Sequence, residues 1–396
     1  MPDFDYSRLR RFPDVEAANL QAWDATDELL VEWALAAGIA GDEIAVIGDE
    51  YGAITLALSD AGLRGIRVHQ DLVTGRRALA NNARALGADG FVPHELDATL
   101  LAGARLVLLQ LPRSLAALEE ISDAVARWAA SDVVLVAGGR VKHMTLAQND
   151  VLARHFTSVQ PQRAARKSRL LLTSAPSSPP AASGRSAEKP LPAPETTTHV
   201  VSGAGSGFSR VEFVLCAYGG AFAGAKLDIG TRALLDAMPA LAAPGAAPAT
   251  PRLRVIDLGC GTGALAVAFA LQHPDATIIA TDRSAAAVRS ARATVDANGL
   301  RDRITVTLDD AGSELPAASA DLVLLNPPFH LGASVHEGAG RRLIEAAARL
   351  TRPGGEVWTV FNSHLDHRRS LAREIGPTEQ VSRTPKFTVT RSIRRP

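Results

Sequence analysis

The fold is decided by the stretch Arg254-Val255-Ile256-Asp257-Leu258-Gly259-Cys260-Gly261-Thr262-Gly263. It starts as a short apolar run and turns at the glycines, and the Ala-rich sequence 264–270 that follows has the composition of a helix. Glycines let the chain bend tightly and bring backbone N–H groups against a ligand at the start of such a helix. The stretch therefore predicts the strand, glycine turn and helix of a nucleotide-binding α/β unit.

The spacing of the three glycines distinguishes between ligands. A dinucleotide loop has the pattern G-x-G-x-x-G, whereas here the third glycine comes one position earlier and an aspartate lies in the strand end. This departure favours S-adenosylmethionine (SAM) as the cofactor. The cofactor-binding residues predicted in this stretch are Asp257, Gly259, Gly261 and Gly263.

Two later strand-like runs also end in acidic residues. The run 277–281 is followed by Asp282, and the run 304–308 is followed by Asp309 and Asp310. A carboxylate at Asp282 can accept both ribose hydroxyls, and one after the next strand can meet the adenine amino group. Any single aspartate here can equally be a turn or helix-cap residue. Three acidic strand ends in this order favour the cofactor site.

A second informative stretch, Asn326-Pro327-Pro328-Phe329, directly follows the apolar run 320–325. It is therefore expected at the carboxyl end of a strand, where open α/β sheets bind ligands. An exocyclic amine on a base is a poor nucleophile because its lone pair is delocalised into the ring. The Asn326 side-chain oxygen and the Pro327 carbonyl can accept hydrogen bonds from the amine and aim its lone pair at a sulfonium methyl group.

The rest of this motif supports the same interpretation. Prolines fix φ and restrict the residues before them, so the acceptors are preorganised, and Phe329 offers a face for base stacking. No strong general base is required, because the amine loses its proton easily once it carries the methyl group. An isolated Asn-Pro-Pro is more often a simple turn, but after a SAM-type loop it indicates methyl transfer to nitrogen. The predicted catalytic residues are Asn326, Pro327, Pro328 and Phe329.

A Pro-rich segment divides the chain in two. Residues 174–198 contain six prolines and many Ser, Ala and Thr residues, which is typical of an extended, disordered linker. The predicted domains are 1–172 and 200–396, joined by a linker at 173–199.

The first half repeats the second in outline. Residues 44–52 take the place of the glycine loop. Asp71 follows Gly48 by the same number of residues as Asp282 follows Gly259. The sequence Gln-Leu-Pro-Arg, which begins at Gln110, stands where the acceptor motif is expected. The halves therefore look like a duplicated methyltransferase fold.

The first copy, however, is predicted to lack catalysis. Two of its three loop glycines are taken as missing, with Glu50 at the second position, and its Gln-Leu-Pro-Arg has neither Asn nor Phe. Negative charge beside the SAM carboxylate is unfavourable. We therefore expect the first half to be a degenerate, silent module for substrate binding or scaffolding.

The composition is that of a globular protein, with 46% hydrophobic residues, 21% charged residues and no net charge. The N-terminus has no signal pattern and no run is long and apolar enough to span a membrane, so a cytoplasmic protein without a membrane partner is predicted. Cys216 and Cys260 form no disulfide framework. His364 and His367 lack a partner cluster, so no metal is predicted.

The charges are unevenly distributed. Residues 341–396 contain twelve Lys and Arg against five Asp and Glu. Such an excess can contact phosphates, although an ordinary solvated face of a terminal helix and hairpin explains it equally well.

With a degenerate half followed by a half carrying Asn-Pro-Pro-Phe-His, the chain resembles the ribosomal RNA guanine-N2 methyltransferases, the family of small subunit methyltransferase C and large subunit methyltransferase G. The likeness covers nearly the whole chain outside the linker. Besides residues 326–330 it includes Gly220-Ala221-Phe222, Leu227-Asp228-Ile229-Gly230-Thr231 and Arg383-Thr384-Pro385-Lys386-Phe387-Thr388-Val389.

The resemblance implies two tandem class I methyltransferase domains with mostly parallel, seven-stranded sheets, and SAM-dependent transfer to the N2 amine of a guanine in ribosomal RNA. It places Gly230 and Thr231 near the methionine end of SAM, Asp282 at the ribose and Asp310 near adenine. Residues Asn326 to Phe329 would hold the flipped guanine, and Asn326 also counts among the cofactor-binding residues. The implied substrate-binding residues are Phe329, His330, Lys386 and Phe387.

Other functions stay open at this point. A protein glutamine or DNA adenine N-methyltransferase presents a similar planar amide or amine to such a motif, although tyrosine is the usual aromatic residue there. A SAM-binding ribosome-assembly factor without turnover belongs to a different class. The expected partner is ribosomal RNA or a ribosomal subunit, and a monomer is expected.

Overall fold

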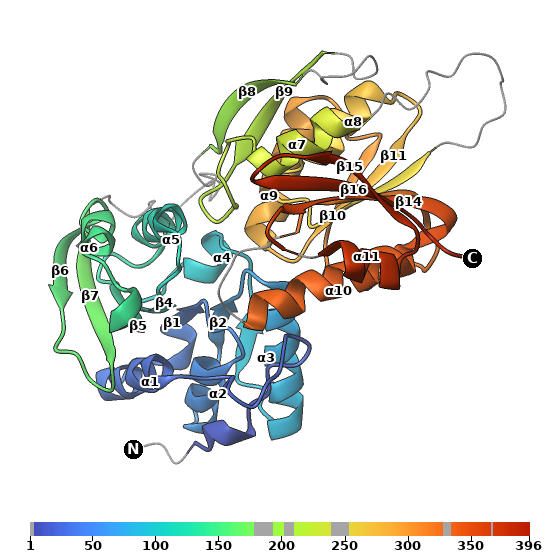
Figure 1. Ribbon diagram of the computed structural model, residues 1–396. Helices are drawn as coiled ribbons and strands as arrows, with labels where there is room; N and C mark the ends of the chain where they lie inside the picture. Colours follow the sequence, from blue (N-terminus) through green and yellow to red (C-terminus); the bar gives the residue numbers. More distant parts are fainter. Residues whose placement is uncertain (1–3, 178–192, 202–209, 239–252, 328–333, 366) are drawn as a thin grey trace. The chain divides into compact units, whose positions relative to one another are not determined.

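The computed structural model describes residues 4–177, 193–201, 210–238, 253–327, 334–365 and 367–396 (Figure 1). The chain divides into two compact units, unit 1 at Met1–Ala193 and unit 2 at Pro194–Pro396. Each unit is described by itself below.

Unit 1 is built on a seven-stranded sheet in the order β3-β2-β1-β4-β5-β7-β6. The first five strands of this order pair in parallel, and β7 pairs antiparallel with β5 and β6. The strands are β1 (Ile44–Ile47), β2 (Ile66–His69), β3 (Phe91–Pro93), β4 (Leu106–Gln110), β5 (Val134–Arg140), β6 (Phe156–Pro161) and β7 (Ser168–Pro176). The helices are α1 (Ala25–Ala37), α2 (Ala53–Asp60), α3 (Val73–Leu86), α4 (Ala98–Leu101), α5 (Leu115–Trp128) and α6 (Leu146–Leu152), with 3-10 turns at Tyr6–Arg8, Gly41–Glu43 and Val141–His143.

Unit 2 repeats this order as β12-β11-β10-β13-β14-β16-β15. Its strands are β10 (Arg254–Leu258), β11 (Thr277–Asp282), β12 (Ile304–Leu308), β13 (Ala320–Leu325), β14 (Thr351–Asn362), β15 (Thr378–Arg383) and β16 (Phe387–Ile393). Its helices are α7 (Ile229–Ala237), α8 (Ala264–Gln272), α9 (Ala285–Ala297), α10 (Ser334–Leu350) and α11 (His367–Glu374). An antiparallel pair, β8 (Glu195–Val201) and β9 (Val211–Ala217), stands apart from the large sheet. The predicted fold of two seven-stranded α/β sheets is confirmed.

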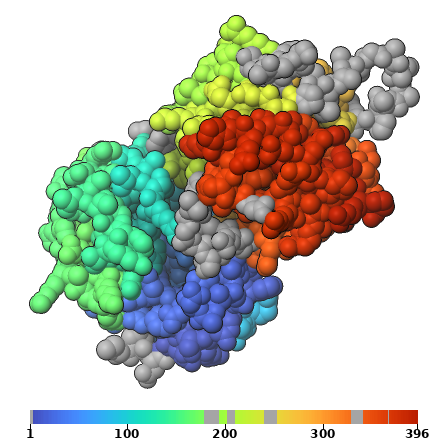
Figure 2. Space-filling view, in the orientation of Figure 1, coloured from blue at the N-terminus to red at the C-terminus, as the bar shows by residue number. Residues whose placement is uncertain are grey.

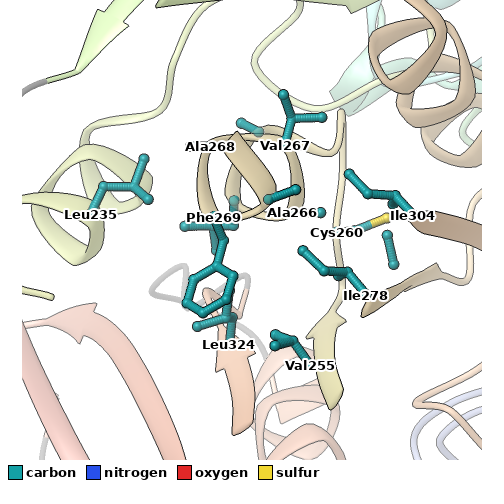
Figure 3. Packing of buried hydrophobic residues seen from close by; sticks show 14 of the residues in the cluster. Leu235, Val255, Cys260, Ala266, Val267, Ala268, Phe269, Ile278, Ile304 and Leu324 are labelled. Carbon is teal, nitrogen blue, oxygen red and sulfur yellow. The ribbon is translucent and has the colours of Figure 1, made fainter. Parts of the chain in front are cut away.

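The sheet of unit 2 is covered on both faces because its central strands are apolar on both. Val255 and Leu324 belong to one buried cluster with α8, whereas their neighbours Ile256 and Leu325 belong to another that includes residues of α10 and α11. Alternate residues of a strand point to opposite faces, so this division is what a doubly covered parallel sheet requires. Figure 3 shows the first cluster, in which the ring of Phe269 from α8 points toward Leu324 and Val255.

The predicted linker overlaps with strands at both ends. Strand β7 continues to Pro176 and β8 begins at Glu195, so residues 173–176 and 195–199 are paired in sheets. The predicted disorder of the Pro-rich centre falls on residues 178–192, which lie outside the described residues. At the other end of unit 2, β15 and β16 form the predicted antiparallel hairpin, and Lys386 immediately precedes β16. In the space-filling view the C-terminal part of the chain, in red, which includes this hairpin, forms a broad area of the surface of unit 2 (Figure 2).

Candidate functional site

The glycine loop connects β10 to α8, as the sequence predicts. All three glycines have positive φ, at 78° for Gly259, 54° for Gly261 and 80° for Gly263, a conformation that other residues adopt only with strain. A Cβ added at Gly259 or Gly261 would meet no atom within 4 Å, whereas one at Gly263 would lie 3.2 Å from the Cβ of Ala291 in α9. The first two glycines thus face open space, and the third lets two helices pack closely.

The loop is tied to the end of β11. The Gly259 N–H donates to the Thr281 carbonyl at 2.8 Å, and the Gly261 N–H donates to Oδ2 of Asp282 at 2.9 Å. The other carboxylate oxygen of Asp282 accepts from the Ser284 N–H at 2.9 Å. These bonds hold the Asp282 carboxylate against the glycine loop, so two predicted cofactor-binding elements come together.

Asp257 lies beneath the loop with only 1% of its surface exposed. Its Oδ2 accepts from the Ala266 N–H in the first turn of α8 at 3.0 Å, while its Oδ1 has no hydrogen-bond partner among the described residues. Burial raises the pKa of the Asp257 carboxyl to about 7, and the nearby Asp282 carboxylate adds to the rise. The structure therefore places an incompletely satisfied acid at the base of the loop.

The two acids after β12 differ in their surroundings. The buried carboxylate of Asp309 accepts from its neighbours, including the Ser313 hydroxyl at 2.6 Å and the Glu314 N–H at 2.8 Å, so it caps the following turn. Asp310 instead pairs with Arg342 of α10 through a 2.6 Å contact. The cap interpretation that the sequence leaves open therefore describes Asp309, and the pairing of Asp310 with Arg342 was not predicted.

Asn326 follows β13 directly and contacts the start of α7. Its Nδ2 donates to Oδ2 of Asp228 and to the Thr231 hydroxyl, both at 3.0 Å. An amide group orients its nitrogen toward acceptors, so the Asn326 oxygen faces the other way. Sequence reasoning gave Asp228 no role in the site, although an Asp before a helix is a helix-cap signal.

Gly230 lies against the same group. A Cβ at Gly230 would come within 3.1 Å of the Asn326 oxygen and 3.3 Å of the Phe387 ring. The Lys386 ammonium lies 5.6 Å from the centroid of the Phe387 ring. The structure thus brings four predicted site residues together: Gly230, Thr231, Asn326 and Phe387.

Part of the predicted acceptor motif is not described. Pro327 is buried next to Asn326, but the predictions for Pro328, Phe329 and His330 fall on residues outside the described ranges.

The loop of unit 1 is more similar to that of unit 2 than predicted. Gly48 and Gly52 have φ of 80° and 93°, and Gly52 precedes α2 as Gly263 precedes α8. Only the middle glycine is missing, so the prediction of two lost glycines is wrong. Asp49, which lies between Gly48 and Gly52, is buried and accepts hydrogen bonds from the N–H groups of Ile54 and Thr55 at 3.2 and 2.7 Å.

The strand register also corrects the position equivalent to Asp282. His69 pairs with Ile47 just as Thr281 pairs with Leu258, so the next residue, Gln70, stands at the equivalent position. The number of residues after the loop predicted Asp71, but the stretch that joins paired residues of β1 and β2 is one residue shorter than the stretch that joins paired residues of β10 and β11. Unit 1 thus has a neutral amide where unit 2 has a carboxylate.

Unit 1 repeats the contact between an amide and the entry helix, the helix that precedes the glycine loop in each unit (α1 in unit 1 and α7 in unit 2). Gln110, the last residue of β4, donates from Nε2 to Oδ1 of Asp27 at 2.5 Å. Asp27 is the third residue of α1, as Thr231 is of α7. Burial raises the pKa of the Asp27 carboxyl well above its usual range, and the Asp49 carboxylate adds to the rise.

Comparison with known proteins identifies the family. A family model described as the methyltransferase small domain matches residues 212–391, and one described as the RLMG N-terminal domain matches residues 2–178. The ribosomal RNA large subunit methyltransferase G of Pseudomonas aeruginosa is 32% identical over 389 residues, which cover 96% of each chain. The chain belongs to the ribosomal RNA large subunit methyltransferase G family.

Other members of the methyltransferase G family and one solved structure agree with this. The protein of the same name from Streptomyces avermitilis is 33% identical over 390 residues, 98% of this chain and 97% of that protein. The structure of the T. thermophilus 16S rRNA N2 G1207 methyltransferase, in complex with AdoMet and guanosine, has a TM-score of 0.71 at 20% identity, and the match covers 94% of this chain and 92% of that one. The predicted family resemblance is confirmed, and the second comparison supports the fold.

The described part of this methyltransferase G family member offers neither a metal site nor a membrane span. Within the described residues, no group of three or more His, Cys, Asp and Glu side chains is arranged to hold a metal ion. In the same part of the chain, no helix is both long and apolar enough to cross a membrane.

Proposed function

We propose that the chain is a SAM-dependent methyltransferase that modifies the exocyclic N2 amine of a guanine in large-subunit ribosomal RNA. The names of the family's members support large-subunit ribosomal RNA as the substrate. The solved relative, named as an N2 methyltransferase and bound to guanosine, supports the base and the atom.

The residues of the glycine loop fit SAM as the cofactor. Open space lies in front of Gly259 and Gly261, their backbone path starts a helix, and the Asp282 carboxylate is fixed beside them. We propose that Asp282 accepts from the ribose hydroxyls, that Asp310 lies near adenine, and that Gly230 and Thr231 lie near the methionine end. When bound, SAM supplies an electrophilic methyl group on a sulfonium.

The observation that carries the proposal is the orientation of Asn326. Because its nitrogen is engaged by Asp228 and Thr231, its oxygen is left to accept a hydrogen bond from a substrate amine. An amine held by this oxygen and by the Pro327 carbonyl has its lone pair directed away from both acceptors. Such a site selects a group that carries hydrogen-bond donors, as the guanine amine does.

We also propose roles for the residues around this centre. Phe329, His330, Lys386 and Phe387 would contact the substrate, the base stacking on an aromatic ring and Lys386 approaching a phosphate. Unit 1 would bind substrate or act as a scaffold without transferring methyl groups. The Asp49 carboxylate already accepts from the N–H groups at the start of α2, where a bound ligand would otherwise be placed. The chain would act as a monomer, which light scattering coupled to size exclusion tests directly.

The test of function is transfer of labelled methyl from SAM to four substrates: large-subunit particles, small-subunit particles, protein-free ribosomal RNAs, and a mixture of protein and DNA. Nucleoside analysis then identifies the product. We expect label in N2-methylguanosine from large-subunit RNA. Label only in protein glutamine or DNA adenine, or SAM binding without any transfer, contradicts the proposal and favours the alternatives named above.

A further inference from the structure

The Asn326 amide is held from one side by a carboxylate whose own position is fixed. Oδ2 of Asp228 accepts from the Gly230 N–H at 2.9 Å and from the Thr231 N–H at 3.2 Å, which caps α7. The same oxygen accepts from the Asn326 amide at 3.0 Å. A side-chain oxygen that accepts from the first N–H groups of a helix is held in a fixed position, so the cap keeps this acceptor in place.

The carboxylate discriminates between the two orientations of the amide. In the observed orientation both amide hydrogens have acceptors, Asp228 and Thr231. A half-turn about the last side-chain bond would place the amide oxygen against the Asp228 carboxylate and lose that hydrogen bond, whereas the Thr231 hydroxyl can donate as well as accept. That orientation is disfavoured because a carboxylate only accepts hydrogen bonds.

We propose that Asp228 is a positioning residue for methyl transfer, which keeps the oxygen of Asn326, and not its nitrogen, turned toward the substrate amine. The inference rests on the proposed function. In the flipped orientation the amide would offer N–H donors to a group that is itself a donor, and the amine would lose one of its two acceptors. Gly230 is part of the arrangement, since a side chain there would crowd the Asn326 oxygen at 3.1 Å and the Asp228 carboxylate at 2.9 Å.

A purely structural role for this contact makes a different prediction. Unit 1 has an equivalent contact between Gln110 and Asp27, although its loop lacks the middle glycine. A contact of this kind can therefore serve only to hold the entry helix against the sheet. If Asp228 served only this use, its removal would lower stability without changing the rate of transfer by the folded protein.

The test uses Asp228→Ser in the full chain. Serine keeps an oxygen for the helix cap but is too short to reach the Asn326 amide. The matched control is Asp24→Ser, because Asp24 caps α1 of unit 1 through the Thr26 N–H at 2.6 Å. We expect both variants to fold and to bind SAM within about threefold of wild type, and we expect kcat to fall roughly 10- to 100-fold only in Asp228→Ser.

Two further measurements separate positioning from stability. In the double variant with Asn326→Ala, Asp228→Ser should cause no additional loss, because it acts through Asn326. By NMR, the Asn326 side-chain amide, assigned by its absence in Asn326→Ala, should show two distinct, slowly exchanging protons in wild type. We expect the two signals to move toward those of a free amide in Asp228→Ser.

Each outcome decides the matter. Wild-type kcat and an unchanged amide spectrum in folded Asp228→Ser overturn the inference. If that variant does not fold, Asp228→Gly takes its place, since glycine is tolerated at a helix N-cap and offers no acceptor to Asn326, and an unchanged kcat there overturns the inference equally. Wild-type protein that methylates no guanine would defeat the proposed function instead, while the amide spectrum would still report whether Asp228 fixes Asn326.

Discussion

The N–H of Gly261 donates a 2.9 Å hydrogen bond to the carboxylate of Asp282, so the glycine loop and the end of the neighbouring strand form one unit. A second bond from Ser284 fixes the other oxygen of the same carboxylate. One side chain thereby shapes the loop and presents a negative charge beside it. Loss of Asp282 is expected to affect the cofactor more than the fold.

Asp282→Ala should weaken SAM binding about 10- to 100-fold, because it removes an ionised acceptor and loosens the loop. Asp275→Ala is the matched control, since Asp275 is exposed in the turn before β11, at the other end of the strand. Isothermal calorimetry with both variants measures the effect. Equal SAM affinities for the two variants would remove Asp282 from the cofactor site.

Gly261→Ala should lower SAM affinity by at least about tenfold, because the new Cβ would project into the open space before the loop. Gly299→Ala is the control, because Gly299 has a similar φ of 65° and also faces open space, but it lies before β12, at the amino ends of the strands. Both changes should cost about 1–2 kcal/mol of stability through backbone strain. Calorimetry for SAM and denaturant unfolding should therefore separate ligand binding from strain.

Asn326→Ala should reduce methyl transfer about 100-fold or more while SAM stays bound, because the substrate amine loses an oriented acceptor. Gln110→Ala, at the equivalent position of unit 1, should keep kcat within about threefold. Single-turnover transfer to large-subunit RNA measures both. Comparable losses in the two variants would mean that the amide after the fourth strand is needed for the fold in both units.

Asp257 should make the stability of the protein without SAM depend on pH. Its pKa is about 7 in the folded chain and about 3.9 in an unfolded one, so between these values the folded state binds more protons. The contribution of Asp257 to the free energy of unfolding therefore falls as pH rises through this window and is constant on either side. Relative to Asp257→Asn, wild type should lose roughly 1 kcal/mol or more between pH 4 and pH 8, measured by urea unfolding. A difference independent of pH would show that Asp257 titrates normally.

The sequence predicts the fold well because its signals are local. The glycine loop, the apolar runs and the acidic strand ends each lie within a few residues, and their order along the chain places them in the sheet. Gly259, Gly261 and Asp282 were found in this way and do come together. The Asp228–Asn326 contact joins residues 98 positions apart, and the helix-cap signal at Asp228 says nothing about its second partner.

Local signals also explain the errors. Asp71 was expected at the position of Asp282 because the two intervals are equal, but strand pairing is set by hydrogen bonds and not by interval, and Gln70 takes the position. Asp309 and Asp310 are adjacent and chemically identical in the sequence. Only their surroundings, a capped turn for one and Arg342 for the other, tell them apart.

Gly48 and Gly52 follow the same left-handed backbone path as Gly259 and Gly263, so unit 1 has the course of the chain without the side chains of the second loop. Repair of this loop would need new side chains but no new course of the chain. A variant with Asp49→Cys, Glu50→Gly and Tyr51→Thr would carry the residue types of the second loop while Gln70 still replaces the acid. The number of SAM molecules bound per chain, counted by calorimetry, would then show whether this backbone with the residue types of the second loop is enough for a SAM pocket.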